Sequence, residues 1–287
     1  MLIDLQLHST YSDGYLAPAA LAEFIAGRGV KIASLTDHNT VGGLAEFKLA
    51  CAKHKIKAIN GLELYAKLNG RKFNLLWYNF DQTSPALHQL LRQSQIRRRR
   101  QIRLALIKLK KYGFKLEPDK LLDKFSRYIP VNRLIDQICL IVRNKDLIAK
   151  KIGSSSPAQG DIIKTLFGPR GIAKMSNCRI AFEHILKLRR RIGGQLILNH
   201  PGKHNQLDEK LIAALKKVGL DGLEMISPHH PINAAMFIQR LAGRYKLIAT
   251  GGSDFHLSET GQAKLKNCYD YFRVEAKHLS GINKIIG

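Results

Sequence analysis

Histidines and carboxylates recur at the ends of short apolar segments throughout this sequence. The residues of this kind are His8, Asp13, His38, Glu63, His200, Asp254 and His256. Imidazole nitrogens and carboxylate oxygens together form a ligand set that suits Mn, Zn or Fe better than a soft metal. The pattern therefore predicts a site for divalent metal ions.

Each of these residues, taken alone, also fits an ordinary structural role. A histidine at a strand end is often a satisfied core residue, and Asp13 in Ser12-Asp13-Gly14 is typical of a turn. Glu63 is harder to explain in this way, because it lies in an apolar segment where an unpaired carboxylate is costly. The recurrence of seven such residues at five predicted strand ends favours one common site.

The elements that must position these side chains alternate between apolar strands and amphipathic helices. Strands are predicted at 2–8, 31–38, 56–66, 72–80, 195–200, 221–227 and 246–256. Helices are predicted at 17–29, 44–55, 181–194, 208–219 and 234–245. This order is typical of an α/β fold with parallel strands covered by helices. Because the loops after such strands converge at one edge, we expect the metal-binding residues to meet there.

The middle of the chain has a different pattern. Apolar residues follow helical spacing between charged ones, as at Leu87, Leu90, Leu91, Ile102, Leu106 and Leu109. Segment 154–160 has the composition of a loop. We therefore predict three parts: the first part of a barrel at 1–84, a mostly helical insertion at 85–175, and the second part of the barrel at 176–287.

Five short motifs occur one after another along the chain. They read L-x-L-H-S-T-Y-S-D-G, S-L-T-D-H-N-T, G-L-E, L-N-H-P-G and G-S-D-F-H, and D-G-L-E-M-I-S-P-H-H fits a further segment. In order and spacing they resemble the PHP (polymerase and histidinol phosphatase) domain family, from residue 2 to about residue 260. With the helical insertion, the chain is most similar to the subgroup of nucleoside 3′,5′-bisphosphate phosphatases and short-RNA exonucleases.

The resemblance implies a distorted (β/α)7 barrel that holds up to three divalent metal ions. Asp13, His38 and His256 would hold one, and His8, Glu63 and Asp254 a second, while Glu63 and His200 would contribute to a third. Asp13, His38, Glu63 and Asp254 would be the catalytic residues. The implied activity is that of a metal-dependent phosphoesterase, a phosphatase or exonuclease, in which a metal-activated hydroxide attacks a phosphomonoester or phosphodiester of a nucleotide or short oligonucleotide.

Two departures from the family pattern leave a second function open. Gln6 and Asn74 stand where the family usually has histidine, and their amide oxygens are expected to be weak metal ligands. The alternative is a catalytically weakened module that binds polyanions, such as RNA or a nucleotide, or a partner protein. Arg133 and His229 are candidate substrate-binding residues, although an exposed helix arginine and a surface-loop histidine are the ordinary explanations.

The charge of the chain also points to anionic partners. Lys and Arg total 47 against 22 Asp and Glu, which gives a net charge of +25. Such a charge favours polyanions through electrostatic steering and counterion release. The run Arg97 to Arg100 would either grip an RNA or nucleotide backbone or form a solvated helix face.

Apolar runs and cysteines bear on where the protein acts. No run of residues approaches the ~20 apolar residues of a membrane-spanning helix. Cys51, Cys139, Cys178 and Cys268 are widely separated and form no C-x-x-C pair, which is typical of reduced thiols. We therefore expect a cytoplasmic protein that does not bind a membrane.

Overall fold

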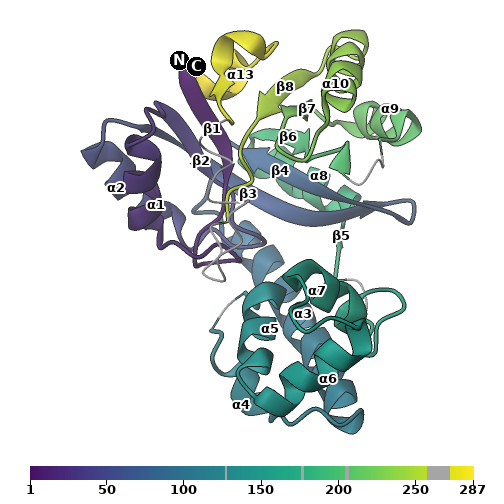
Figure 1. Cartoon of the computed structure of the whole chain (residues 1–287). Coiled ribbons are helices and arrows are strands. Elements are labelled where there is room, and N and C mark those ends of the chain that lie inside the picture. Colours follow the sequence, from purple (N-terminus) through teal and green to yellow (C-terminus); the bar gives the residue numbers. More distant parts are fainter. Residues whose placement is uncertain (127, 176–177, 204–206, 257–271) are drawn as a thin grey trace. The chain divides into compact units, whose positions relative to one another are not determined.

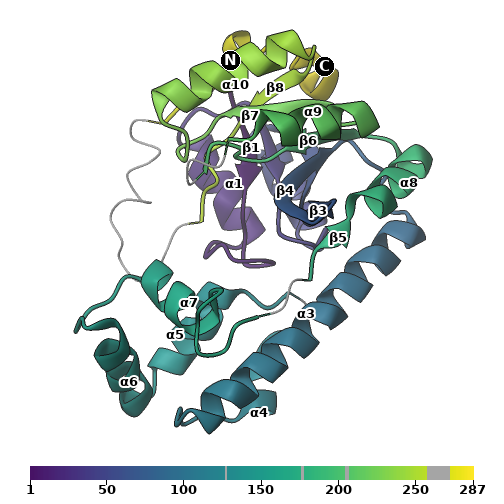
Figure 2. The ribbon, with the colours of Figure 1, turned by 90° about the vertical axis from the view of Figure 1, so that its right-hand side faces the viewer.

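The computed structural model describes residues 1–126, 128–175, 178–203, 207–256 and 272–287, so Cys268 lies outside it (Figures 1 and 2). The chain divides into two compact units. The first contains residues 1–89 and 179–287, and the second contains residues 90–178. All seven predicted metal-binding residues belong to the first unit, so their positions relative to one another are fixed within one body.

The first unit is built on one sheet in the strand order β8-β7-β6-β4-β3-β2-β1-β9, with β5 paired to β3. Its strands are β1 (Leu2–Leu7), β2 (Ile32–Leu35), β3 (Lys57–Leu68), β4 (Arg71–Tyr78), β5 (Ile180–Ala181), β6 (Gln195–Leu198), β7 (Gly222–Ile226), β8 (Ile248–Gly251) and β9 (Val274–Glu275). The pairs β1–β2, β2–β3, β6–β7 and β7–β8 are parallel. The predicted alternation of strands and helices accounts for these pairs.

The sheet curls until its two ends nearly meet. The segment after β8 runs beside the end of β1. Leu7 and Phe255 form a parallel β-bridge there, and the backbone N–H of His8 donates to the Phe255 carbonyl over 3.1 Å. The interior is apolar except near the strand ends, with Leu5, Leu7, Leu62 and Leu76 fully buried. The expected α/β fold, a distorted barrel with a mostly helical insertion, is therefore confirmed.

One strand departs from the parallel arrangement. We predicted parallel strands from the repeated alternation, but β4 runs antiparallel to both β3 and β6. The reason lies in the connection, which is a tight hairpin at Asn69 and Gly70, with φ angles of 49° and 78°. Asn-Gly is the preferred sequence for such two-residue turns, because both residues must adopt positive φ. The hairpin makes β4, which carries Asn74, the neighbour of β3, which carries Glu63.

Helices cover the sheet of the first unit. They are α1 (Pro18–Ala26), α2 (Leu44–Lys53), α8 (Phe182–Ile192), α9 (Glu209–Val218), α10 (Ile232–Arg244), η2 (Ala276–His278) and α13 (Asn283–Ile286). In Figure 1, α1 and α2 lie side by side next to β1 and β2. Asp208 caps α9 by accepting the Leu211 N–H over 3.0 Å. These helices bury the outer face of the sheet and leave the strand ends open for polar residues.

The second unit is helical and has its own core. Its helices are α3 (Pro85–Lys111), which begins in the first unit, α4 (Pro118–Leu122), α5 (Val131–Cys139), α6 (Val142–Ile152) and α7 (Gln159–Phe167). Ile102, Leu106 and Leu109 of α3 are fully buried in this core, as their spacing predicted. Leu134 of α5 and Leu166 of α7 pack in the same cluster.

The basic run on α3 divides into two pairs. Arg98 donates to the Ile129 carbonyl over 2.9 Å and lies over the Tyr128 ring, while Arg99 bonds the Leu122 and Phe125 carbonyls. These two arginines therefore hold the helical unit together. Arg97 and Arg100 are exposed. No helix of the described residues has the length and apolar character needed to cross a membrane.

Candidate metal centre

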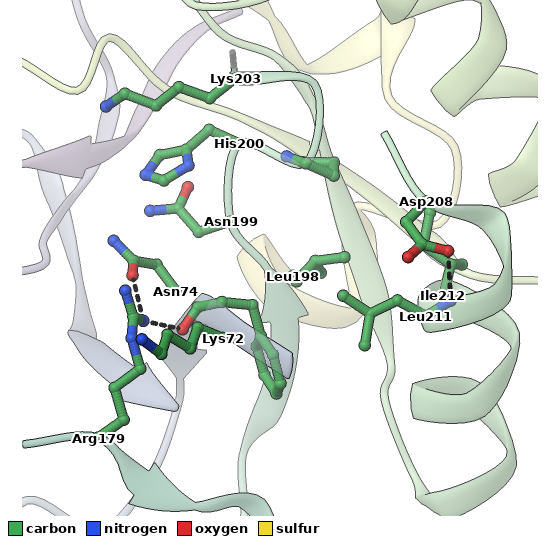
Figure 3. Close-up of a pocket in the computed structure, with 12 residues that line it drawn as sticks. Lys72, Asn74, Arg179, Leu198, Asn199, His200, Lys203, Asp208, Leu211 and Ile212 are labelled. Carbon is green, nitrogen blue, oxygen red and sulfur yellow. Dashed lines mark hydrogen bonds between the residues drawn. The ribbon is translucent and has the colours of Figure 1, made fainter. Parts of the chain in front are cut away.

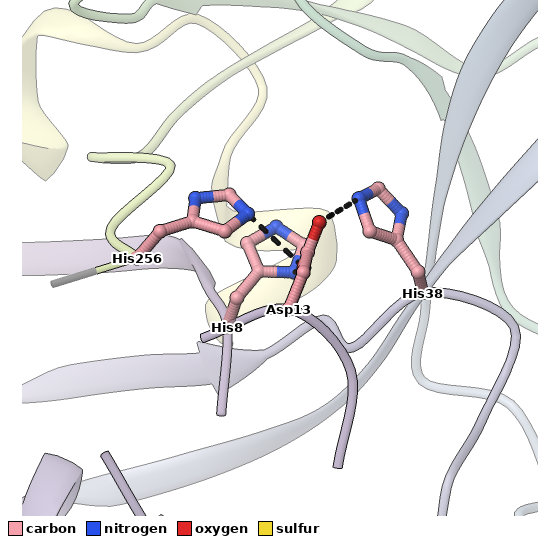
Figure 4. Close-up of side chains that lie close together, drawn as sticks. All are labelled: His8, Asp13, His38 and His256. Atoms are coloured by element: carbon pink, nitrogen blue, oxygen red, sulfur yellow. Dashed lines mark hydrogen bonds and ion pairs between the residues drawn. The ribbon is translucent and has the colours of Figure 1, made fainter. Parts of the chain in front are cut away.

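Asp13 is the centre of the first cluster of candidate ligands (Figure 4). Its Oδ2 lies 3.3 Å from His38 Nε2, and its Oδ1 lies 3.1 Å from His256 Nε2. His8 Nδ1 completes the group at 3.6 Å from Oδ1. One donor atom from each of these four residues lies within 4.8 Å of the others. The loop after β1, the bridge after β2 and the segment after β8 thus converge on one point.

Asp37 fixes the loop that carries Asp13. Its carboxylate accepts the Ser9 N–H over 2.8 Å and the Ser9 hydroxyl over 2.6 Å, and it also accepts the Ser12 hydroxyl. Burial raises the pKa of the Asp37 carboxyl, although His8 and the two serines oppose that effect. Asp37 therefore holds in place the loop that presents Asp13 to the histidines.

A second cluster forms around the other face of His8. His8 Nε2 lies 3.2 Å from Glu63 Oε2 and 3.1 Å from Asp254 Oδ1, and all three side chains are buried. Glu63 lies on β3, and Asp254 follows β8. His8, Glu63 and Asp254 also form a group able to hold a metal ion. His8 therefore stands between two candidate sites and belongs to both.

Two candidate ligands adopt an unusual backbone conformation. His200 has φ 27° and Asp254 has φ 49°, both in the left-handed region that residues with a Cβ rarely adopt. Such strain is typical of functional sites. The backbone N–H of His200 donates over 3.0 Å to the carboxylate of buried Glu224 on β7. This hydrogen bond stabilises the turn at His200. The His200 ring reaches the centre from the edge, with Nε2 3.8 Å from Glu63 Oε1.

The electrostatics of the two clusters favour a cation. Burial alone would raise the pKa of the Asp13 carboxyl, but His38 and His256 outweigh it and hold that pKa well below its usual range. Burial would lower the pKa of His8, yet Asp254, Glu63 and Asp13 raise it well above the ordinary value. The buried carboxylates thus draw positive charge to this point, which a proton or a metal ion can supply. His200 differs, because burial lowers its pKa to about 4.

The donor set fits a divalent metal. Neither ring nitrogen of buried His8 makes a hydrogen bond of good geometry within the described residues, so both face the carboxylates without being satisfied by them. An imidazole that lacks a partner is costly in the interior and is a normal metal ligand. Residues of the first cluster would hold a metal through three imidazoles and the Asp13 carboxylate.

The side-chain amides of Gln6 and Asn74 present nitrogen to the carboxylates. Asn74 Nδ2 donates to Glu63 Oε1 over 2.7 Å. Gln6 Nε2 donates to Asp254 Oδ1 over 2.9 Å and approaches Glu63 Oε2 at 3.5 Å. We expected their oxygens to be weak ligands. The Asn74 oxygen accepts from Arg179 over 3.1 Å, whereas the buried Gln6 oxygen has no hydrogen-bond partner among the described residues. Sequence alone did not indicate this orientation, because it depends on neighbours that are distant along the chain.

The candidate substrate-binding residues lie in different units. His229 belongs to the first unit, and its Nε2 lies 2.6 Å from Asp254 Oδ2. Arg133 lies on α5 of the second unit, and its role in binding phosphate stays a prediction. His230 is turned away from the carboxylates, since its ring bonds the Met225 carbonyl and the Gly202 N–H.

A cavity of about 280 Å³ opens beside His200 (Figure 3). Three cationic side chains line it, those of Lys72, Arg179 and Lys203, together with the carboxylate of Asp208. Asn199 also lines it, and both atoms of its buried amide lack a hydrogen-bond partner among the described residues. Apolar walls come from Leu198, Pro201, Leu211 and Ile212. The cavity therefore suits an anionic ligand that also has an apolar part.

Sequence reasoning missed several polar residues of this region. Arg179 carries no local signal, because it lies outside every motif. Lys203 directly follows L-N-H-P-G, so its place in that motif could have indicated it. Glu224 lies in an apolar strand as Glu63 does, and the same argument about buried carboxylates could have found it.

A model of the PHP domain matches residues 4–225 of the chain. The chain belongs to the PHP domain family. The resemblance that the five motifs indicated is thereby confirmed, and the candidate metal centre lies where those motifs meet. Divalent metal ions are in keeping with this PHP protein's two candidate ligand groups.

Several characterised proteins are similar to this PHP protein over most of its length. A 5′-3′ exoribonuclease of Haemophilus influenzae is 29% identical over 260 residues, which cover 88% of this chain and 89% of that protein. A 3′,5′-nucleoside bisphosphate phosphatase of Chromobacterium violaceum is 27% identical over 267 residues, covering 90% and 88%. An amidohydrolase structure from Chromobacterium violaceum with bound sulfate has a TM-score of 0.74 at 24% identity and covers 91% of this chain and 89% of that one. The structural likeness shows the fold.

Proposed function

We propose that this PHP protein is a metal-dependent phosphoesterase that hydrolyses a phosphomonoester or phosphodiester of a nucleotide or short oligonucleotide. The observation that carries the proposal is the convergence of His8, Asp13, His38 and His256, whose donor atoms lie within 4.8 Å of one another. His8 and His38 of this cluster are buried, and polar rings beside a carboxylate away from water are costly unless a proton or a metal ion binds there. Mn, Zn and Fe are the metals this ligand set suits.

Different residues of the chain have different roles in the proposed reaction. A divalent metal, when bound, lowers the pKa of a water ligand and offsets charge on phosphoryl oxygens. Asp13 and His38 would hold it, while Glu63 and Asp254 orient the groups around it. Lys203 Nζ lies 3.3 Å from His229 Nε2 and 3.6 Å from Asp254 Oδ2, and it can donate to a phosphoryl oxygen. Burial lowers the pKa of His200 to about 4, so its ring is neutral near pH 7 and can accept a hydrogen bond.

The substrate class is supported by charge and by relatives. Arg179, Lys72 and Lys203 supply cations to the cavity beside the centre, which suits a phosphorylated ligand. Two relatives of similar length are named as an exoribonuclease and a nucleoside bisphosphate phosphatase. We propose that His229 and Arg133 contribute to substrate binding, and that the protein acts in the cytoplasm.

A second candidate function is a polyanion-binding module with weak catalysis. It is favoured by Gln6 and Asn74, whose amide nitrogens donate to Asp254 and Glu63. The intact cluster around Asp13 favours the enzyme. The two functions differ in whether the metal-loaded protein turns over a substrate that it binds.

The experiment that tests the proposal is phosphate release from a substrate panel. The panel contains a nucleoside 3′,5′-bisphosphate, a nucleoside 5′-monophosphate, a short 5′-phosphorylated RNA and a sugar phosphate, each with MnCl2 or ZnCl2 and with EDTA. We expect release from the nucleotide substrates that EDTA abolishes. RNA binding with no release by the metal-loaded protein would favour the module, and metal-independent release would contradict the metal mechanism.

A further inference from the structure

The orientation of the Asn74 amide is fixed by Arg179 (Figure 3). Arg179 Nη1 donates to Asn74 Oδ1 over 3.1 Å and to the Phe73 carbonyl over 2.6 Å. Because a guanidinium only donates, Asn74 must present its oxygen to Arg179. Its NH2 group therefore faces Glu63 Oε1 at 2.7 Å. The Asn74 oxygen cannot ligate a metal beside Glu63 without breaking its bond to Arg179.

Gln6 has the same polarity at the other carboxylate. Its side chain is fully buried, and its Nε2 lies between Asp254 Oδ1 at 2.9 Å and Glu63 Oε2 at 3.5 Å. If the Gln6 amide were flipped, its carbonyl oxygen would face two carboxylates. The repulsion between these oxygens is strong in the low-dielectric interior, so the flipped orientation is unfavourable. Gln6 thus also acts as a hydrogen-bond donor.

Every oxygen of the Glu63 and Asp254 carboxylates consequently faces a nitrogen of the protein. Glu63 Oε1 faces Asn74, and Glu63 Oε2 faces His8 at 3.2 Å. Asp254 Oδ1 faces Gln6, and Asp254 Oδ2 faces His229 at 2.6 Å, with the Lys203 ammonium 3.6 Å away. These donors occupy the positions at which a second metal would bind the two carboxylates.

His8 cannot serve both candidate sites in its neutral form. A neutral imidazole has one nitrogen with a free lone pair and one N–H. If His8 Nδ1 ligates a metal beside Asp13, its Nε2–H faces Glu63 and Asp254 at 3.2 and 3.1 Å, at ion-pair distance and without good hydrogen-bond geometry. A carboxylate placed beside the second nitrogen commonly orients a metal-bound histidine. The opposite choice would leave Nδ1–H facing Asp13 at a long 3.6 Å.

Given the proposed metal-dependent function, we propose that this chain binds one metal ion tightly, in the cluster of His8, Asp13, His38 and His256. Glu63 and Asp254 are then positioning residues held by Gln6, Asn74 and His229, and hydrogen-bond donors take the place of a second metal. The first cluster places three histidines around one carboxylate. Lys203 supplies a positive charge beside Asp254 in place of a second divalent ion.

The test is the number of Mn ions per chain, measured on the stripped protein after titration with MnCl2 by calorimetry and by elemental analysis after dialysis. We expect one tight Mn in wild type and none in Asp13→Ala. Glu63→Gln should keep one, bound about 10–100-fold more weakly because an orienting group is lost. Two or more tight Mn ions in wild type would overturn the proposal whether or not any variant folds, as would loss of the tight ion in a folded Glu63→Gln.

Restoring imidazole supplies the complementary test. The double change Gln6→His and Asn74→His should raise the count to two or more, while Gln93→His, an exposed residue of α3, should leave it at one. A double variant that stays at one would contradict the claim that the amides exclude a second metal. Anomalous scattering at the Mn edge should place the wild-type ion next to Asp13. Phosphate release is measured separately. A number of Mn ions other than one leaves the proposed function unaffected, and the absence of phosphate release with one Mn bound contradicts only that function.

Discussion

Asn74 donates its amide N–H to Glu63 across 2.7 Å, from the neighbouring strand of an antiparallel pair. Glu63 is fully buried, and its carboxylate depends on such donors for its charge. The pair therefore shows how this PHP protein stabilises a carboxylate of its centre with protein groups.

Replacing Asn74 by Asp should turn this attractive contact with Glu63 into a repulsive one. A second carboxylate would then face that of buried Glu63, while Arg179 beside it offsets part of the repulsion. We expect the free energy of unfolding in EDTA to fall by about 1–3 kcal/mol. The loss should shrink in MnCl2, because a cation can be shared by the two carboxylates. Urea denaturation of wild type and Asn74→Asp, with and without MnCl2, measures both effects.

The matched control for that experiment is Asn283→Asp. Asn283 is exposed on α13, so the same chemical change should alter stability by no more than about 0.5 kcal/mol. Equal destabilisation by the two changes, or none by Asn74→Asp, would show that the contact with Glu63 contributes nothing.

Asp37→Asn should weaken metal binding although it changes none of the proposed metal ligands. Asp37 holds the loop of Asp13 through Ser9 and Ser12, and an amide can accept fewer of these bonds. We expect Mn affinity to fall about 10–100-fold, as it does when groups that orient ligands are lost. Calorimetric titration with MnCl2 checks this, and an unchanged affinity would mean that the loop is held by other contacts.

Lys203→Met should lower phosphate release with little effect on Mn affinity. The ammonium lies beside Asp254 and His229 and is proposed to donate to the phosphoryl group. Removal of one such donor typically costs about 100-fold or more in kcat. Steady-state rates of wild type, Lys203→Met and Lys217→Met, an exposed lysine of α9, make the comparison. Equal rates in all three would remove Lys203 from the mechanism.

Arg97 and Arg100 should account for any salt-dependent binding of RNA by the basic run. They are exposed, whereas Arg98 and Arg99 bond carbonyls of their own unit. Each phosphate contact contributes a slope of about −0.7 to log K against log salt on a single strand. Fluorescence anisotropy with a short RNA should give a shallower slope for Arg97→Gln with Arg100→Gln than for wild type. An unchanged slope would identify the run as a solvated helix face.

The sequence indicated the polar residues of this centre better than it indicated their partners. His8, Asp13, His38 and Asp254 could be found because each follows a strand, and parallel strands bring such positions together. The orientation of Asn74 could not be found, because it depends on Arg179, which is more than a hundred positions away along the chain. The antiparallel course of β4 was missed, although Asn69-Gly70 is a recognisable hairpin signal.

The central claim is that metal bound around Asp13 supports hydrolysis, and one comparison tests it most directly. Phosphate release from a nucleoside 3′,5′-bisphosphate is measured for wild type and Asp13→Ala, each stripped of metal and then supplied with MnCl2. We expect release by wild type only after MnCl2 is added, and a loss of at least about 100-fold in Asp13→Ala. Release by Asp13→Ala at the wild-type rate would contradict the account.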